Sequence, residues 1–131
     1  MLIKAEQSLL LMIDLQERLA PAIHEFAEVQ RHNAWLQEIA RRLSVPIVAT
    51  VQYPAGLGNM VAALAEGTAP DHLVEKIHFS AQADGCLARL PALSRPQVVI
   101  TGTEAHVCVL QTALDLLAAG KEVYVVAEAV G

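Results

Sequence analysis

The sequence is poor in cysteine, aromatic residues and basic residues, and each shortage excludes a class of protein. Its 131 residues include 2 cysteines, too few for the dense disulfide framework of a small secreted domain, so we expect free thiols and a cytoplasmic protein. The 9 Lys and Arg residues against 14 Asp and Glu residues give a net charge of −5. Arg41 and Arg42 form the one adjacent basic pair, so we expect no nucleic-acid partner.

Long hydrophobic runs are also missing, although 54% of the residues are hydrophobic. The apolar stretches are far shorter than the roughly 20 residues that span a bilayer, so we expect no membrane partner. The first run, Leu9 to Ile13, meets Asp14 before any cleavage-like region, which argues against a signal peptide. A chain of this size buries about two-thirds of its unfolded surface, enough for one domain. A sheet covered on both faces and a homo-oligomer interface would absorb the apolar surplus.

Short apolar runs rich in β-branched residues predict buried strands. They lie at residues 8–13, 47–51, 98–101 and 123–126, with a shorter one at 74–77. Helical spacing of apolar residues predicts helices over 26–43 and 107–119, and a short helix over 84–93. This alternation predicts an α/β fold with a parallel sheet and right-handed crossovers, whose ligand crevice lies at the carboxyl ends of the strands.

Cys108 is the sharpest candidate for chemistry, because the segment GTEAHVC places it between a buried strand and a helix. Unpaired amides and the helix dipole in a first helical turn favour a thiolate. Lowering the thiol pKa from about 8.5 by about two units would make the thiolate the major form at neutral pH. The alternative is a buried cysteine that packs as a small hydrophobic residue, and the spacing leaves both open.

Asp14 and Lys76 also follow or end predicted strands. Asp14 is either a solvated residue that ends a strand or a base that takes the thiol proton. Lys76 is either a surface lysine or a cation that keeps Asp14 ionised and attracts a thiolate. The functional interpretation of each residue is strengthened by the other two, because an acid, a cation and a thiol occur at the same edge of the predicted sheet.

The remaining polar residues point to no cofactor. His78 and His106 lie near strand exits without the spacing of metal ligands, so we expect no metal. The glycines form neither G-x-G-x-x-G nor a P-loop, so a flavodoxin-like nucleotide binder rests on fold analogy alone. We expect Cys86 to pack on the short helix, and residues 52–58 (QYPAGLG) to form a turn or loop that lines the site.

Four segments carry a resemblance to a known family. They are LLLMIDLQERLAPAI (9–23), VPIVATVQYPAGLG (45–58), VEKIHFSA (74–81) and VVITGTEAHVCVLQTALDLLAAGKEVYVVAEAV (98–130). In this order they resemble the isochorismatase-like cysteine hydrolases, and within them the small isochorismatase domain-containing protein group. The likeness covers nearly the whole chain.

The resemblance implies a three-layer αβα sandwich, Rossmann-like, with a mainly parallel sheet. It assigns a catalytic triad: Cys108 as nucleophile, Asp14 as general base and Lys76 as the supporting cation. A non-prolyl cis peptide is expected near Thr103 and Glu104, with backbone amides around Glu104 and Cys108 forming an oxyanion hole. The implied reaction is thiolate attack on a small amide-like carbon–nitrogen substrate through a thioester. We expect the substrate-binding residues to be Gln52, Tyr53, Phe79 and His106.

The chain departs from its relatives in three respects. Nicotinamidase-type members place an Asp and two His where Val51, Gln52 and Tyr53 stand, which argues against nicotinamide and a metal. Close relatives carry an acid at the position of Val51. The family continues past the position of Gly131 with a further strand and helix, so residues 1–131 are taken as one isochorismatase-like hydrolase domain, naturally short or C-terminally incomplete.

Two functions therefore stay open. Isochorismate-cleaving members generally lack the cysteine, so Cys108 favours a carbon–nitrogen hydrolase over an isochorismatase. The alternative is a catalytically inactive binding or assembly subunit with the same fold, which the missing acid at Val51 and the short chain favour.

Overall fold

A computed structural model describes residues 2–131, apart from the side chain of Asp84, and is built on one sheet. The strands are Ser8–Ile13 (β1), Ile47–Gln52 (β2), Leu73–Lys76 (β3), Gln97–Gly102 (β4) and Glu122–Val130 (β5). The α-helices are Phe26–Arg42 (α1), Pro54–Leu57 (α2), Ala62–Ala65 (α3) and Leu110–Ala118 (α4). Every strand pair is parallel, so the predicted α/β class is confirmed.

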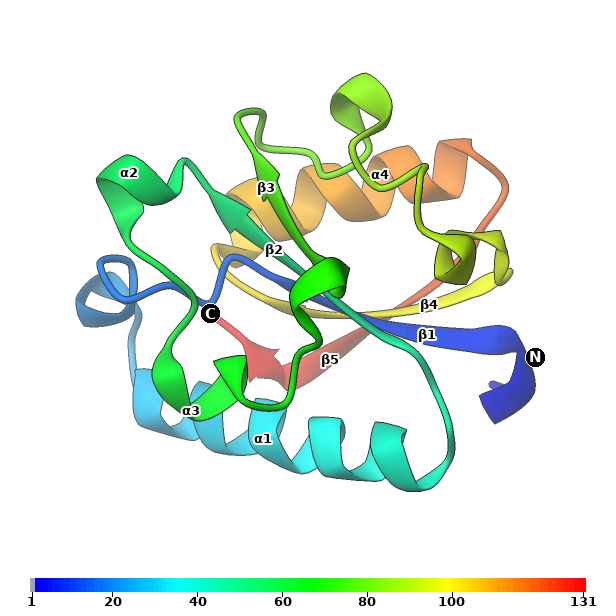
Figure 1. The fold of residues 1–131 in the computed structure, drawn as a ribbon, viewed down its shortest axis with the longest axis horizontal. Helices are drawn as coiled ribbons and strands as arrows, with labels where there is room; N and C mark the ends of the chain where they lie inside the picture. The colour runs from blue at the N-terminus through cyan, green and yellow to red at the C-terminus, as the bar shows by residue number, and fades with distance from the viewer. Residues whose placement is uncertain (1) are drawn as a thin grey trace.

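The order of the strands places a topological switch point beside β1. The sheet runs β3-β2-β1-β4-β5, so the chain builds outward from β1 in one direction and then returns to its other side with β4. In open parallel sheets, ligands bind outside the carboxyl ends of the strands at such a reversal. The carboxyl ends of the strands lie on the left in Figure 1, beside α2. The loops after β1 and β4 meet at this edge.

Helices cover both faces of the sheet and give the three-layer αβα sandwich. Figure 1 shows α1 and α3 on one face and α4 on the other. All six residues of β1 are buried, because alternate side chains enter the two cores. Leu9, Leu11 and Ile13 join the cluster under α4, whereas Leu10 and Met12 join the cluster under α1. In the described part of the chain, no helix is both long and apolar enough to cross a membrane.

The predicted elements agree with the structure where apolar runs are long and differ where they are short. The first strand matches at both ends, and the others differ by one to four residues at an end. The predicted helix over 84–93 is wrong: this stretch holds two 3-10 turns, Ala83–Gly85 and Pro91–Ser94. The predicted loop at 52–58 contains the short helix α2, whose first residue is Pro54. The helix predicted from 107 begins as a π-helical turn, Ala105–Val109, before α4.

Candidate active site

Asp14 is buried and held from two neighbouring strands. It follows β1 directly, adopts a left-handed backbone (φ 47°) and has no exposed surface. Its amide donates to the Thr50 carbonyl (3.1 Å), and the Thr50 hydroxyl donates to Asp14 Oδ1 (2.8 Å). The Thr103 hydroxyl donates to the Asp14 carbonyl (2.6 Å). A carboxylate this deeply buried needs a positive partner, because an isolated buried charge is very costly.

Lys76, the last residue of β3, is that partner. Its Nζ lies 2.8 Å from Asp14 Oδ2, and both side chains are almost fully buried. Nζ also donates to Gln52 Oε1 (2.8 Å) and to the carbonyls of His78 (3.1 Å) and Phe79 (3.0 Å). The readings of Asp14 as a solvated strand end and of Lys76 as a surface lysine are therefore wrong. The ammonium belongs to a buried ion pair at the carboxyl edge of the sheet.

Cys108 lies in the π-helical turn that follows β4 and packs in the apolar cluster under α4. It is 7% exposed, yet it is close enough to Asp14 and Lys76 for both to act on its ionisation. Burial, and then the charge of Asp14 and a hydrogen bond to it, raise the pKa of the thiol to about 12, which Lys76 partly offsets. The expected depression of this pKa is therefore wrong, because desolvation and the carboxylate outweigh the helix dipole. The resting sulfur is a thiol.

The backbone before Cys108 has the expected irregularity. The peptide bond between Thr103 and Glu104 is cis, as the family resemblance predicts. The Glu104 carbonyl accepts from the amides of Val107 (3.1 Å) and Val109 (3.2 Å), which closes the turn. Among residues 2–131, the Glu104 amide has no hydrogen-bond partner. It is therefore a donor available at this edge, beside the thiol turn.

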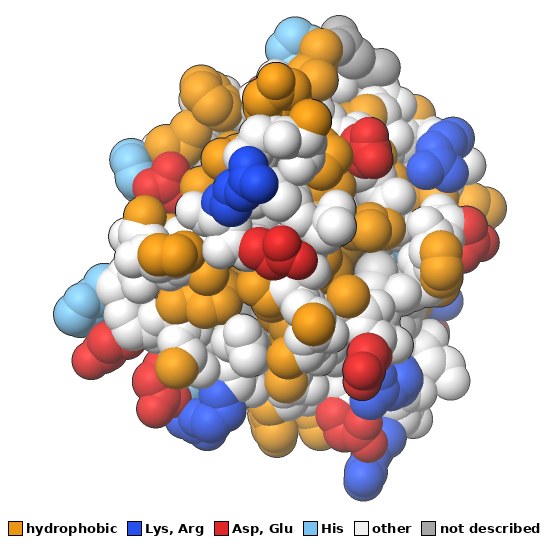
Figure 2. Space-filling model, turned by 60° about the vertical axis from the view of Figure 1, so that its left-hand side comes forward, with side chains coloured by type: hydrophobic (Ala, Val, Ile, Leu, Met, Phe, Trp, Pro, Cys, Tyr) orange, Lys and Arg blue, Asp and Glu red, His pale blue; other side chains and the backbone are white. Residues whose placement is uncertain are grey.

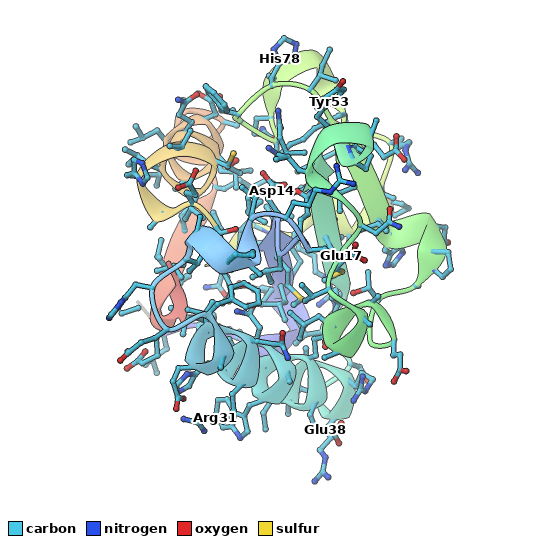
Figure 3. All side chains as sticks on the ribbon, turned by 90° about the vertical axis from the view of Figure 1, so that its left-hand side faces the viewer. Asp14, Glu17, Arg31, Glu38, Tyr53 and His78 are labelled. Carbon is cyan, nitrogen blue, oxygen red and sulfur yellow. The ribbon has the colours of Figure 1, made fainter. Side chains whose placement is uncertain are left out.

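The residues expected to bind substrate are less closely gathered. Tyr53 and Phe79 are 58% and 54% exposed, and His106 is exposed on the π-helical turn. Gln52 is instead engaged with Lys76. A cavity of about 400 Å³ between α2 and the loop after β3 is lined by Tyr53 and Lys76, whereas Phe79 and His106 are not part of its lining. Figure 3 looks onto this edge, with Asp14 near the middle and Tyr53 and His78 to one side.

Thr50, Thr103 and Gln16 also help to build this edge of the sheet, and they were not singled out from the sequence. Thr50 and Thr103 fix Asp14, as described above. Gln16 is fully buried and ties the exits of β1 and β2 together: its Oε1 accepts from the Gln52 amide (2.7 Å), and its Nε2 donates to the Gln52 carbonyl (2.9 Å). The sequence feature that could have identified these residues is a polar side chain within or just after an apolar strand.

The site shows no arrangement of metal ligands. Within residues 2–131, no group of three or more His, Cys, Asp and Glu side chains is placed to hold a metal ion. Val51, where the family resemblance leads us to expect an acid, is 3% exposed and packs in the cluster under α1. Among the described residues, the groups available for chemistry are therefore a buried thiol and the ion pair beside it.

Comparisons with known proteins identify the family of the chain. Residues 8–131 match the isochorismatase domain family. The chain is 41% identical over 125 residues to isochorismatase domain-containing protein 2 of Danio rerio, covering 94% of this chain and 62% of that protein. The chain thus spans less than two-thirds of the length of this curated relative.

Two solved structures have the same fold. One, described as the MAR1 ribonuclease from Caenorhabditis elegans, superposes with a TM-score of 0.89 at 41% identity, covering 98% of this chain and 66% of that one. The other is YcaC from Pseudomonas aeruginosa, solved with hexane-2,5-diol and covalent acrylamide; its TM-score is 0.86 at 26% identity, with coverage of 98% and 66%. Fold, family match and sequence identity lead to one conclusion: the chain belongs to the isochorismatase domain family.

Proposed function

We propose that the protein is a cysteine hydrolase that cleaves a small amide-like carbon–nitrogen bond through a thioester at Cys108. The observation that carries the proposal is the buried Asp14–Lys76 ion pair, 2.8 Å between Oδ2 and Nζ, within reach of the thiol. A structural cysteine in an apolar core has no need of a buried ion pair beside it. Burying one is costly, so its retention at the crevice favours a chemical role.

The thiol requires a base, because its pKa of about 12 leaves almost no thiolate at neutral pH. In the proposed first step, Asp14 takes the thiol proton while the sulfur bonds to the carbonyl carbon. Asp14 then returns this proton to the leaving nitrogen as the carbon–nitrogen bond breaks. Water attacks the thioester with Asp14 again as base, and the departing sulfur recovers a proton as the acid is released. The Lys76 ammonium, 2.8 Å from Oδ2, pairs with the charge of Asp14 between the steps.

The tetrahedral oxyanion needs donors that are in place before the reaction. The amide of Glu104, which has no partner within residues 2–131, and that of Cys108 are proposed for this role. Each such donor is worth about 3 kcal/mol of transition-state stabilisation in other hydrolases. Tyr53, Phe79 and His106, which lie exposed around this edge, are proposed to contact the rest of the substrate.

The test is turnover of small amides and imides by wild type, Cys108→Ala and Asp14→Asn. We expect both variants to lose at least about a hundredfold in kcat, the range of a lost general base. Acrylamide serves as a mechanism-independent probe, because it is bound covalently in the related YcaC structure. Its adduct should form on Cys108. Full turnover by Cys108→Ala on a substrate that wild type hydrolyses would overturn the proposal.

RNA is the second substrate class to include, because a relative that shares 41% identity is described as a ribonuclease. Figure 2 shows the Lys and Arg side chains on the drawn face scattered among acidic ones, which does not favour a phosphate backbone. The inactive binding or assembly subunit remains the alternative outcome. It would be supported by wild type and Cys108→Ala behaving alike with every substrate.

The proposed assembly is a homo-oligomer in the cytoplasm. Leu110, Leu114 and Leu117 on the outer face of α4 are 47%, 55% and 51% exposed, so this helix is apolar on both faces. Exposed apolar residues gathered on one helix face are typical of a protein–protein contact surface. Light scattering after gel filtration measures the molar mass in solution, and a monomer at micromolar concentration would contradict the oligomer.

A further inference from the structure

The ammonium of Lys76 has more acceptors around it than it has hydrogens. Three hydrogen bonds, to Gln52 Oε1 and to the carbonyls of His78 and Phe79, use its three N–H groups. Oδ2 of Asp14 lies 2.8 Å from Nζ as an ion-pair partner, yet it receives no N–H hydrogen bond from the described residues. Oδ2 is thus paired with the ammonium by charge, and no donor within residues 2–131 makes a hydrogen bond to it. The thiol of Cys108 is close enough to this carboxylate for its charge to act on the sulfur, whereas the other oxygen, Oδ1, accepts from the Thr50 hydroxyl (2.8 Å).

Gln52 is the one side chain among these three acceptors, and its orientation is defined. Its Nε2 donates to the Ile77 carbonyl (3.2 Å), so Oε1 is the atom that faces Lys76. Its backbone is fixed on both sides by the buried amide of Gln16, whose Nε2 also donates to the Gly58 carbonyl (2.9 Å). Gln52 is therefore pre-organised to receive an N–H of Lys76, which is the work of a positioning residue rather than of a substrate ligand.

We propose that Gln52 positions the ammonium of Lys76 so that none of its hydrogens is directed at Asp14, which leaves Oδ2 open to accept the Cys108 thiol proton. The inference deepens the proposed hydrolase function and rests on it. The neutral amide matters as much as the hydrogen bond. A carboxylate at position 52 would provide the same acceptor but would place a second negative charge beside the site.

Two nearly isosteric substitutions separate these contributions. In Gln52→Met the freed N–H turns to Oδ2, so the carboxylate becomes less negative toward the sulfur and the thiol ionises more easily. In Gln52→Glu the added carboxylate competes for Lys76 and repels a thiolate, so the thiol ionises less easily. Asp14, directly after β1, and Lys76, the last residue of β3, are the charged groups that act on Cys108. A purely structural role for Gln52 would shift the thiol in the same direction in both variants.

The experiment measures the rate of alkylation of Cys108 by iodoacetamide between pH 7 and 10, by peptide mass spectrometry of the full chain. At pH 9 we expect Gln52→Met to react at least about threefold faster than wild type and Gln52→Glu at least about threefold slower, since half a pKa unit changes the thiolate fraction about threefold. Cys86 in the same samples is the internal reference. Gln30→Met and Gln30→Glu on α1 are the matched controls, and both should react as wild type.

Gln52→Asn, whose side chain is too short to reach Lys76, is a second variant without the acceptor and should behave as Gln52→Met does. It replaces Gln52→Met if circular dichroism shows that the latter is unfolded. Equal rates in all variants, or shifts in the same direction for Met and Glu, would overturn the inference. Because alkylation needs no substrate, this failure is distinguishable from that of the hydrolase function, which only turnover by Cys108→Ala tests.

Discussion

Gly102 of β4 is paired with Ile13 of β1 so closely that a side chain at position 102 has no space. The two residues are in register, and a Cβ on Gly102 would lie 1.9 Å from the Ile13 carbonyl oxygen. Gly102 also has φ +117°, a conformation that L-residues rarely adopt. The contact joins the ends of β1 and β4 directly before Asp14 and Thr103, so the crevice depends on it.

We therefore expect Gly102→Ala to be severely destabilising, because it combines backbone strain with a steric clash. The free energy of unfolding should fall by about 2–5 kcal/mol, and urea denaturation followed by circular dichroism measures it. Gly120→Ala is the matched control: Gly120 also has a positive φ (+88°), but its Cβ would meet no atom within 4 Å. That change should cost about 1–2 kcal/mol from strain alone. Equal losses in the two variants would contradict the clash.

The pKa of Cys108 predicts an unusual alkylation profile. Because burial and Asp14 raise this pKa to about 12, the rate with iodoacetamide should climb about tenfold per pH unit from pH 7 to 10 without reaching a plateau. Asp14→Asn removes the negative charge that opposes ionisation and leaves Lys76 to favour the thiolate. Its Cys108 should react faster than that of wild type at pH 8, with Cys86 as reference. A wild-type plateau below pH 9 would refute the raised pKa.

The same shift makes stability depend on alkaline pH. The folded pKa of Cys108, about 12, is far above the value of about 8.5 of a free thiol, so the native state binds this proton more tightly than the unfolded state does. The contribution of the protonated Cys108 thiol to the free energy of unfolding is fully present below about pH 8.5 and is lost as the pH rises from there to about 12. Urea midpoints measured at pH 8 and 10 should fall more steeply for wild type than for Cys108→Ala. Parallel curves would show that the thiol is not responsible.

Lys76→Met should be strongly destabilising, because it leaves the fully buried Asp14 carboxylate without its partner. We expect the free energy of unfolding to fall by about 3–5 kcal/mol. Asp14→Asn with Lys76→Met removes both charges, and the double variant should lose less than the sum of the two single losses. A double-mutant cycle by urea denaturation gives the interaction energy. Additive losses would show that the pair contributes no coupling.

Thr50→Val tests the hydrogen bond that holds the other oxygen of Asp14. Thr50 is 1% exposed and donates to Oδ1 at 2.8 Å, so the isosteric change leaves a buried acceptor with one donor fewer. The expected loss is about 1–3 kcal/mol in unfolding free energy. Thr50→Ser keeps the hydroxyl and should lose less than Thr50→Val. The reverse order would indicate that the methyl group, rather than the hydrogen bond, matters here.

The architecture was largely predictable because buried parallel strands leave a strong trace in sequence. The run Ser8–Ile13 is apolar on both faces of the sheet, and the structure has β1 at those residues. The stretch from 84 to 93 was not predictable in the same way. Its prolines and glycine allow short turns that a helical pattern cannot distinguish from a helix, and the structure has 3-10 turns there.

The gathering of Asp14, Lys76 and Cys108 followed from their common place at strand ends, but their ionisation did not. A pKa depends on burial and on distances to charges, and neither is written in the spacing of GTEAHVC. The role of Gln52 could not be predicted for the same reason, because it depends on contacts in the folded structure. As a polar residue after a strand it pointed to substrate binding, whereas its partner is the buried ammonium of Lys76. The catalytic and binding roles stay predictions for the experiments above.

Lys76 ends a strand of four residues at one margin of the sheet, paired with β2 on one side only. Strands in such positions open most readily, whereas the interior strands β1 and β4 open with the whole molecule. Brief fraying of β3 would withdraw the cation while the acid and the thiol stay in place. Of the three groups, the cation is therefore the one carried by an edge strand, and amide exchange in residues 73–76 would measure how often that strand opens.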